Sequence, residues 1–527
     1  MKHAFKPLGI AAAVAAASAS YVNVANAQVT VANNALGDLA LVPYYTEEGD
    51  FITGIHLVNT SNSTQGVKFR FRRAEDSLDA LDFNVVMSPE DVYAGFLSDD
   101  ADGNIFWSAD DTSCTVPATT DGRLQMPAIF RPGAETGYVE VILMGEPTSE
   151  LEPIAIAAKH GSDGEPLDCE AVRSNFFAAS VSVNNDVTIQ DDTDLDLDDD
   201  DDTDELLNDY TDSGNALKVS YFIRDNASGI EFGDNAVHIQ NFIDVPSITN
   251  QQFGFLSGDL NGFDFPDLDG TSPTGTNAQR MRFETLRSTS TLGVSSLINE
   301  WTSNAANGAQ LDWVVTMPGQ YTMVNLPLFI ADYQDGLDGD DDDDWTCTRT
   351  TDDDAFIVSD GDDLQDVLDK DETVFVCDYR DIPVRAFIDD TIYNREEARP
   401  SDPEGTLTVS PAIPGSTPST FLEKETNVIT FNGGSVLGVS DNNINVTLGE
   451  DQPFGWAQLS VSSASGDQRV CNWIQPEPDV AIQRDGTCIS VLSSGRVPMI
   501  GFAAWARQVA ANPNASYGRI VAHSFTS

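Results

Sequence analysis

Positive charge is scarce in this sequence. Its 527 residues include 27 Lys and Arg against 85 Asp and Glu, which gives a formal net charge of −58. A chain this acidic repels nucleic acid and anionic membrane surfaces, so we expect cations as partners and no nucleic acid. Asp dominates the acidic clusters, and its short side chain suits turns and metal-binding loops.

Common catalytic signatures are also missing. The sequence has no G-x-S-x-G, H-E-x-x-H or G-x-x-x-x-G-K-[ST] pattern, so nothing supports an α/β-hydrolase elbow, a zincin metalloprotease or a phosphate loop. A dispersed Ser-His-Asp triad stays open, because triads are recognised by geometry and not by order. We therefore expect the protein not to be an enzyme, with no catalytic residues and no cofactor other than Ca²⁺.

Beyond its N-terminus the chain lacks an apolar run long enough to span a bilayer, which takes about 20 residues. The first 27 residues combine a basic start, an apolar run over 8–17 and the small-residue pattern Ala25-Asn26-Ala27. This layout predicts a signal peptide over residues 1–27. We expect the mature protein to be exported, to the extracellular space, the cell surface or the periplasm.

Cysteine is sparse but even in number, with six in the chain. No two cysteines have C-x-x-C spacing, so a redox motif or zinc knuckle has no support. An even count in an exported chain favours disulfide bonds, and each local loop that a disulfide closes adds about 2–4 kcal/mol of stability. Of the 15 pairings that six cysteines permit, we expect neighbours in sequence to pair: Cys114 with Cys169, Cys347 with Cys377, and Cys471 with Cys488.

The hydropathy pattern is that of β-strands. Residues 51–58 and 67–72 alternate apolar and polar positions, and turn formers at 59–63 separate them, which predicts a hairpin. Short helices are expected at 291–303 and 501–511. Further strands are expected at 81–87, 138–144, 217–224, 236–242, 311–317, 321–329, 427–431 and 454–461.

Short strands separated by turn signals predict a mainly β protein with two β-sandwich-like lobes and few short helices. Residues 191–205 are an acidic low-complexity run, and we expect an acidic linker or loop over 186–212. The predicted N-terminal domain is therefore 28–185. The predicted C-terminal domain is 213–527, with an acidic insertion at 335–372.

Several segments resemble a group of uncharacterised exported proteins of Gram-negative bacteria that are labelled only as cell-surface proteins. The resemblance implies export and a shared β fold, and it implies no catalytic residue because the group has no assigned activity. The segments that carry it are Asn34-Ala35-Leu36-Gly37-Asp38, Pro43-Tyr44-Tyr45, Leu57-Val58-Asn59-Thr60-Ser61, Asp312-Trp313-Val314-Val315-Thr316-Met317-Pro318, Arg395-Glu396-Glu397, Glu425-Thr426-Asn427-Val428-Ile429 and Pro498-Met499-Ile500-Gly501-Phe502.

Calcium is the metal that this composition favours, since Ca²⁺ takes about 6–8 oxygen ligands from carboxylates and carbonyls. Four Asp-rich segments offer such ligands, although none completes the D-x-[DN]-x-[DN]-G-x₅-E loop. The alternatives are solvated spacers for the long Asp runs and ordinary Asp/Gly turns for the short ones. The candidate ligands are Asp100, Asp102, Asn104, Asp194, Asp196, Asp198, Asp264, Asp267, Asp269, Asp338, Asp340 and Asp342.

These features together predict a non-enzymatic exported or cell-surface protein with a structural or adhesive role. Its expected partners are cations and cell-surface or matrix components. The alternative is a secreted hydrolase acting on polysaccharide, which needs two carboxyl groups about 5–10 Å apart beside exposed aromatic platforms. Seven tryptophans could supply such platforms or fill the core instead: Trp107, Trp301, Trp313, Trp345, Trp456, Trp473 and Trp505.

Overall fold

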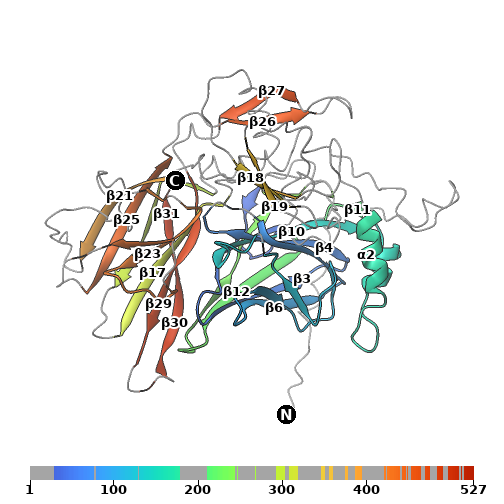
Figure 1. Ribbon diagram of the computed structural model, residues 1–527, viewed down its shortest axis with the longest axis horizontal. Helices are drawn as coiled ribbons and strands as arrows, with labels where there is room; N and C mark the ends of the chain where they lie inside the picture. Colours follow the sequence, from blue (N-terminus) through green and yellow to red (C-terminus); the bar gives the residue numbers. More distant parts are fainter. Residues whose placement is uncertain are drawn as a thin grey trace, which may run out of the picture.

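The computed structural model describes two β lobes that lie side by side (Figure 1). It covers residues 29–178, 210–243, 292–302, 308–318, 421–463 and 497–526, with short gaps, and single positions such as 268. It adds strand backbones within 346–394 and 469–490. Strands account for most of the described residues, so the predicted mainly β fold is confirmed.

Two sheets form the N-terminal lobe. Sheet A runs in the order β1 (Thr30–Val31), β14 (Val237–Gln240), β2 (Leu39–Thr46), β10 (Thr136–Pro147), β4 (Gln65–Arg73), β5 (Asp79–Met87) and β8 (Cys114–Val116), and β11 (Tyr210–Thr211) also pairs with β10. Sheet B runs in the order β13 (Glu231–Asn235), β12 (Leu217–Asp225), β3 (Phe51–Asn59), β6 (Val92–Asp99), β7 (Ile105–Ser108) and β9 (Arg123–Gln125).

Two further sheets form the C-terminal lobe. Sheet C runs in the order β22 (Phe421–Leu422), β21 (Ala386–Asn394), β25 (Phe454–Ser463), β16 (Ser296–Thr302) and β31 (Ser524–Thr526). Sheet D runs in the order β24 (Asn443–Val446), β23 (Thr426–Phe431), β17 (Ala309–Thr316), β29 (Ile500–Arg507) and β30 (Tyr517–Ala522). Within these sheets only the pairing of β23 with β24 is parallel among the described strands.

Smaller elements complete the described chain. Helix α1 (Pro153–Ala158) and helix α2 (Cys169–Ala178) pack at one end of the N-terminal lobe. The remaining strands are β15 (Gly293–Val294) with β28 (Val497–Pro498), β18 (Thr346–Thr350) between β19 (Ala355–Ser359) and β20 (Val374–Cys377), and β26 (Arg469–Ile474) with β27 (Gln483–Ser490).

One predicted disulfide is confirmed, between Cys114 of β8 and Cys169 at the start of α2. It ties the two helices to the edge of sheet A. For the other two predicted pairs the strand register is informative. Antiparallel pairing sets Cys347 opposite Cys377 and Cys471 opposite Cys488, the arrangement that a cross-strand disulfide needs. These two bonds stay predictions.

The predicted hairpin at 51–72 is wrong. Both of its strands exist, but β3 belongs to sheet B and β4 to sheet A, so residues 60–64 cross from one sheet to the other. The apolar residues of the two strands, such as Leu57 and Phe69, meet in one core cluster between the sheets. Alternation identified the strands correctly, but it carries no information about which strand pairs with which.

Both predicted helices are also wrong. Residues 293–302 form β15 and β16, and Ile500–Arg507 forms β29. Alanine favours a helix in isolation, but tertiary packing overrides that preference. Ala503 packs in the core of the C-terminal lobe, whereas Ala504 and Ala506 pack in a cluster shared with the N-terminal lobe. Small side chains on both faces let this strand lie between two cores.

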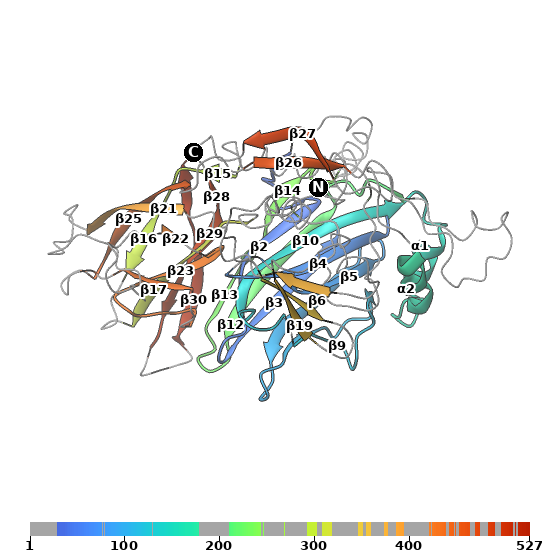
Figure 2. The ribbon, with the colours of Figure 1, turned by 45° about the horizontal axis from the view of Figure 1, so that its top comes forward.

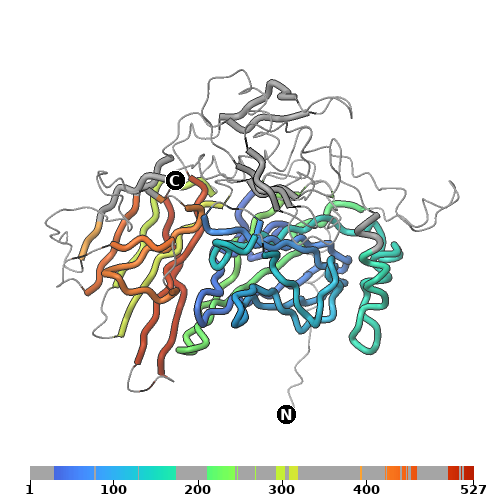
Figure 3. The backbone as a smooth tube through the Cα atoms, in the orientation of Figure 1, coloured from blue at the N-terminus to red at the C-terminus, as the bar shows by residue number. Residues whose placement is uncertain are grey.

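Strand pairing joins residues on both sides of the predicted boundary at 186–212. Strands β12, β13 and β14 follow that segment, yet β12 pairs with β3 and β14 pairs with β2. Figure 3 shows their green trace among the blue strands of the N-terminal lobe. The acidic residues 186–209 and most of 335–372 lie outside the described residues.

The two lobes share a hydrophobic core. Val314, Val428 and Phe502 of sheet D belong to the same buried cluster as the side chains between sheets A and B. Strands β17 and β29 contact β2, and β30 contacts β13, so sheet D covers one side of the N-terminal sandwich (Figure 2). A hydroxyl bond fixes the same junction: Thr316 donates to the carbonyl oxygen of Pro43 across 2.6 Å.

Sheet A buries charged side chains on its other face. Arg72 lies 3.0 Å from Asp79 and 3.0 Å from Glu140, and Lys68 lies 3.3 Å from Asp82. Arg70 is ion-paired with Asp79 as well. The six side chains carry balancing formal charges and are at most 1% exposed. A buried charge requires a partner, so this network depends on every member being present.

We expect Asp79→Asn to lower the free energy of unfolding by about 3–5 kcal/mol, the usual cost of removing one partner from a buried ion pair. The change removes the carboxylate that Arg70 and Arg72 share. Urea unfolding followed by tryptophan fluorescence measures the effect. Asp234→Asn, at an exposed position of β13, is the matched control and should change stability by less than about 0.5 kcal/mol. Equal effects of the two substitutions would contradict the network.

Candidate functional site

The described calcium candidates form a turn. Asp100, Asp102 and Asn104 join β6 to β7, and the Asp100 carboxylate accepts hydrogen bonds from the backbone N–H groups of Asp102 and Asn104 and from the Asn104 amide. These bonds, that from the Asn104 side chain first, lower the pKa of Asp100. The Asp100 carboxylate therefore stabilises this turn by accepting its hydrogen bonds, as Asp does in an ordinary Asp/Gly turn.

The other nine candidate ligands lie outside the described residues: Asp194, Asp196, Asp198, Asp264, Asp267, Asp269, Asp338, Asp340 and Asp342. In the part of the chain that the structure describes, no group of three or more His, Cys, Asp or Glu side chains is arranged to hold a metal ion. The calcium sites therefore stay predictions.

Among the described histidines, His160 comes nearest to a catalytic arrangement. Its Nδ1 lies 3.0 Å from the Ser88 hydroxyl and 3.9 Å from Asp91, and its Nε2 lies 3.1 Å from the Thr112 hydroxyl. A triad needs the nucleophile and the carboxylate on opposite nitrogens of the ring. Ser88 and Asp91 share one nitrogen, and Thr112 has the carbonyl of Gly164 within hydrogen-bonding distance. We interpret the cluster as a set of hydrogen bonds that links neighbouring loops.

His238 and His523 are buried and serve the fold. The backbone N–H of Val219 donates to Nε2 of His238, which leaves Nδ1 as the donor to the carbonyl of Ala236. Burial lowers the pKa of His238 and of His523 to about 4. Both rings are therefore neutral at ordinary pH.

The tryptophans separate into buried and accessible ones. Trp107, Trp301 and Trp313 are fully buried in the cores, Trp456 is 38% exposed, and Trp505 is half-buried. The side chains of Trp345 and Trp473 lie outside the described residues. Both accessible rings belong to the C-terminal lobe, which directs attention to that sandwich.

A corner of the chain shapes this sandwich. Strand β30 pairs with β29 in sheet D, and after His523 the chain continues as β31, which pairs with β16 in sheet C. His523 holds the corner, because its Nε2 lies 3.0 Å from the carbonyl oxygen of Val314 and its Nδ1 lies 2.9 Å from the Asn299 amide. Away from this corner, β16 and β29 end beside an open pocket of about 480 Å³ between the sheets.

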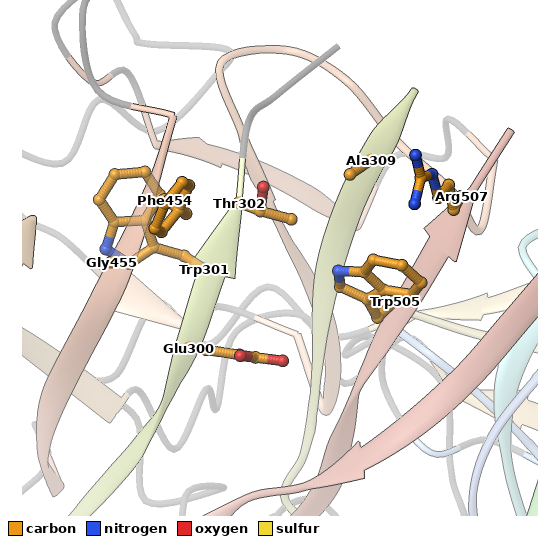
Figure 4. Close-up of a pocket in the computed structure, with 8 residues that line it drawn as sticks. All are labelled: Glu300, Trp301, Thr302, Ala309, Phe454, Gly455, Trp505 and Arg507. Carbon is orange, nitrogen blue, oxygen red and sulfur yellow. The ribbon is translucent and has the colours of Figure 1, made fainter. Parts of the chain in front are cut away.

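Aromatic rings line this pocket, which we call the groove. Trp301 and Phe454 lie on one side, and Trp505 and Arg507 lie on the other (Figure 4). Phe454 is 36% exposed, and Tyr517 extends the second wall with its ring 5.4 Å from that of Trp505. The described residues that line the groove are Glu300, Trp301, Thr302, Ala309, Phe454, Gly455, Trp505 and Arg507.

One ion pair crosses the rim of the groove. Arg519 lies 3.0 Å from Glu300, and its guanidinium carbon lies 4.8 Å from the centre of the Trp505 ring. Both charged side chains are about half exposed, so the pair adds little stability. Its consequence is local: the negative charge of Glu300 is balanced, and one face of Trp505 is covered by Arg519.

The aromatic surface continues onto the outer face of sheet C. Glu300, Trp456 and Tyr393 are opposite one another across β16, β25 and β21, and directly opposed residues of antiparallel strands share a face. The rings of Tyr393 and Trp456 stack with centres 4.6 Å apart. The sequence offered all seven tryptophans as possible sugar platforms without separating Trp456 and Trp505 from the buried ones. It missed Phe454, Glu300 and Arg507, because alternation cannot show which positions face solvent.

Buried acids hold loops elsewhere in the fold, and no sequence pattern pointed to them. Asp312 on β17 accepts hydrogen bonds from the Ser435 hydroxyl and from the backbone N–H groups of Val436 and Leu437. Asp38 accepts from two N–H groups that follow β14. Burial raises the pKa of each to about 7, and burial together with neighbouring carboxylates raises that of Glu47 to about 8.

We expect the protein to lose stability as the pH rises from about 6.5 to 8.5. At the lower end of this range Asp38, Asp312 and Glu47 hold protons in the folded state, while the same groups are ionised in the unfolded chain, so the stability that these protons provide is lost as the pH rises through the folded-state pKa values of about 7 to 8. Raising the pH removes those protons and penalises only the folded state. The two buried histidines act oppositely, but only below about 6.5, where the unfolded chain gains their protons.

Calorimetry of Asp312→Asn isolates one of these groups. The amide oxygen can accept the same three hydrogen bonds but does not titrate, so the fall in melting temperature between pH 6.5 and 8.5 should be smaller than in the parent. Asp110→Asn, at an exposed position, should leave the pH dependence unchanged. An unaltered slope in the Asp312 variant would show that this carboxyl is already ionised at pH 6.5.

Comparison of the chain with protein-family models, curated proteins and solved structures finds no significant match. The resemblance to exported cell-surface proteins therefore stays a prediction. What the protein does has to be inferred from its own residues. The groove is the described feature that offers a ligand both aromatic and charged side chains.

Proposed function

We propose that this protein is a non-enzymatic, exported binding protein that holds a carbohydrate chain in the groove of its C-terminal lobe, in a structural or adhesive role at the cell surface. The observation that carries the proposal is the groove itself, an open pocket with Phe454 on one side and Trp505 on the other. Binding sites are typically concave and largely apolar, with a few polar groups that fix orientation.

The chemistry of the lining suits a sugar better than an apolar ligand. A pyranose ring has apolar C–H faces, which pack on aromatic rings, and hydroxyl edges, which need hydrogen-bonding partners. The groove supplies both kinds of contact, with rings on its walls and Glu300, Thr302 and Arg507 among its polar lining. The stacked pair of Trp456 and Tyr393 beside it would support a neighbouring sugar of an extended chain.

Binding is favoured over hydrolysis by the acids in the groove. A glycosidase of the usual kind needs two carboxyl groups flanking the scissile bond. Glu300 is the only acid in the described lining, and it is already ion-paired with Arg519. A polysaccharide hydrolase remains the alternative, and a second carboxylate near the groove would be its requirement.

Export with cleavage before Gln28 would leave the described fold intact. The first described residue, Val29, is buried, and β1 starts at the next residue and pairs with β14. A mature chain that starts at Gln28 would therefore keep every described element. The disulfide between Cys114 and Cys169 fits an oxidising compartment. In the described residues no helix is both long and apolar enough to cross a bilayer.

Calcium is part of the proposal as a stabiliser of the acidic segments around 191–205 and 335–372. Adjacent carboxylates repel one another, and a divalent cation relieves that repulsion more strongly than monovalent salt. We expect millimolar Ca²⁺ to raise the melting temperature in calorimetry at constant ionic strength, with Mg²⁺ as the matched control. An unchanged melting temperature would remove calcium from the proposal.

We expect Phe454→Ala to weaken glycan binding at least about tenfold, the size of effect typical of truncating an aromatic anchor. Affinity electrophoresis in gels that contain bacterial surface and matrix polysaccharides measures the effect as lost retardation. Phe96→Ala is the matched control, because Phe96 lies in β6 of the other lobe and is 40% exposed. The control should behave as the parent does.

Two outcomes would contradict the proposal. One is that the parent protein is retarded by none of the polysaccharides, or is retarded equally after Phe454→Ala. The other is that Phe454→Ala instead dissociates a dimer in sedimentation experiments, since the groove would then be an interface between two copies of this chain.

A further inference from the structure

The groove carries positive charge in a protein that has little of it. Three charged side chains of the described residues lie at the groove, and two of them, Glu300 and Arg519, neutralise each other through their ion pair. Arg507 remains, and it contributes a full positive charge to the lining. The protein as a whole has a net charge of −58, so this local excess runs against its composition.

Arg507 is placed to meet a ligand. It is the last residue of β29 and is exposed, and its register partner on β30 is Tyr517. Figure 4 shows its guanidinium group extending from β29 toward Ala309, and both residues belong to the lining of the groove. Within the described residues the acid nearest to the groove, Glu300, pairs with Arg519 and not with Arg507.

We infer that the groove recognises an acidic saccharide, with Arg507 binding a carboxylate or sulfate group on a sugar ring that packs against Trp505 and Phe454. This inference rests on the proposed function and adds the class of ligand. A guanidinium group presents its donors in a fixed planar fork that matches an oxyanion with two hydrogen bonds. Arg507 would thus be a specificity-determining residue.

The acidic surface of the protein does not prevent such binding. At physiological ionic strength charges are screened over about 8 Å, so distant carboxylates act weakly on a ligand in the groove. A contact pair between Arg507 and an oxyanion lies inside that distance and keeps most of its attraction. Local charge therefore decides the preference at this site, and net charge does not.

The ligand panel that tests the inference pairs each acidic oligosaccharide with a neutral twin. It contains oligomers of galacturonate, mannuronate, guluronate and glucuronate, each beside its carboxyl-reduced form, and sulfated oligosaccharides beside their desulfated forms. Titration calorimetry at about 0.15 M salt gives the affinities. We expect at least one acidic member to bind about tenfold more tightly than its neutral twin, as one charge-assisted contact implies.

Arg507→Gln should abolish that preference while leaving the affinity for the neutral twin nearly unchanged. Arg123→Gln is the matched control, because Arg123 is an exposed arginine of β9 in the other lobe, and it should keep the preference. Glu300→Gln should strengthen binding of the acidic member several-fold, since it removes a negative charge beside the ligand and releases Arg519.

The outcomes separate this inference from the proposed function. If neutral and acidic twins bind equally, or if the acidic preference survives Arg507→Gln, the inference is wrong while carbohydrate binding stands. If no member of the panel binds in a Phe454-dependent way, both fail together. The sulfated and carboxylated arms identify which oxyanion Arg507 prefers.

Discussion

Sheet D is the part of the structure on which the rest depends, because it contributes buried side chains to two cores, one from each of its faces. One face completes the core of the C-terminal sandwich, and the other lies against the core between sheets A and B. Alternate residues of β29 serve the two cores, with Ala503 on one side and Ala504 on the other. The lobes consequently share packing through sheet D, and the same sheet supplies one wall of the groove.

The scarce positive charges are used in two distinct ways. Lys68, Arg70 and Arg72 are buried in a balanced network on sheet A, where they neutralise acids that could not otherwise be buried. Arg507 and Arg519 lie at the groove, where one balances Glu300 and the other faces the open space. The chain has few cationic side chains, and two of them lie beside the aromatic rings of the groove. This placement favours the groove as a binding site.

The C-terminal sandwich is closed at one corner, where the chain passes from β30 of sheet D to β31 of sheet C. After His523 the chain leaves sheet D and joins sheet C, so the sandwich is closed at that corner and open at the far ends of β16 and β29. Neutral His523 can bridge the two sheets because one ring nitrogen donates and the other accepts.

The sequence by itself determined the mainly β class, many of the strands and the pairing of Cys114 with Cys169, because period-two alternation and local spacing are written in neighbouring residues. Only the tertiary structure decided that β3 and β4 lie in opposite sheets, that 217–240 completes the N-terminal lobe and that alanine-rich β29 is a strand. The groove belongs to the second group: Glu300, Phe454 and Arg507 are far apart in sequence, and only the pairing of β16 with β25 and the packing of sheets C and D bring them together. Sequence patterns describe each strand in isolation, whereas partners, solvent exposure and the sharing of a core depend on contacts between residues that are distant along the chain.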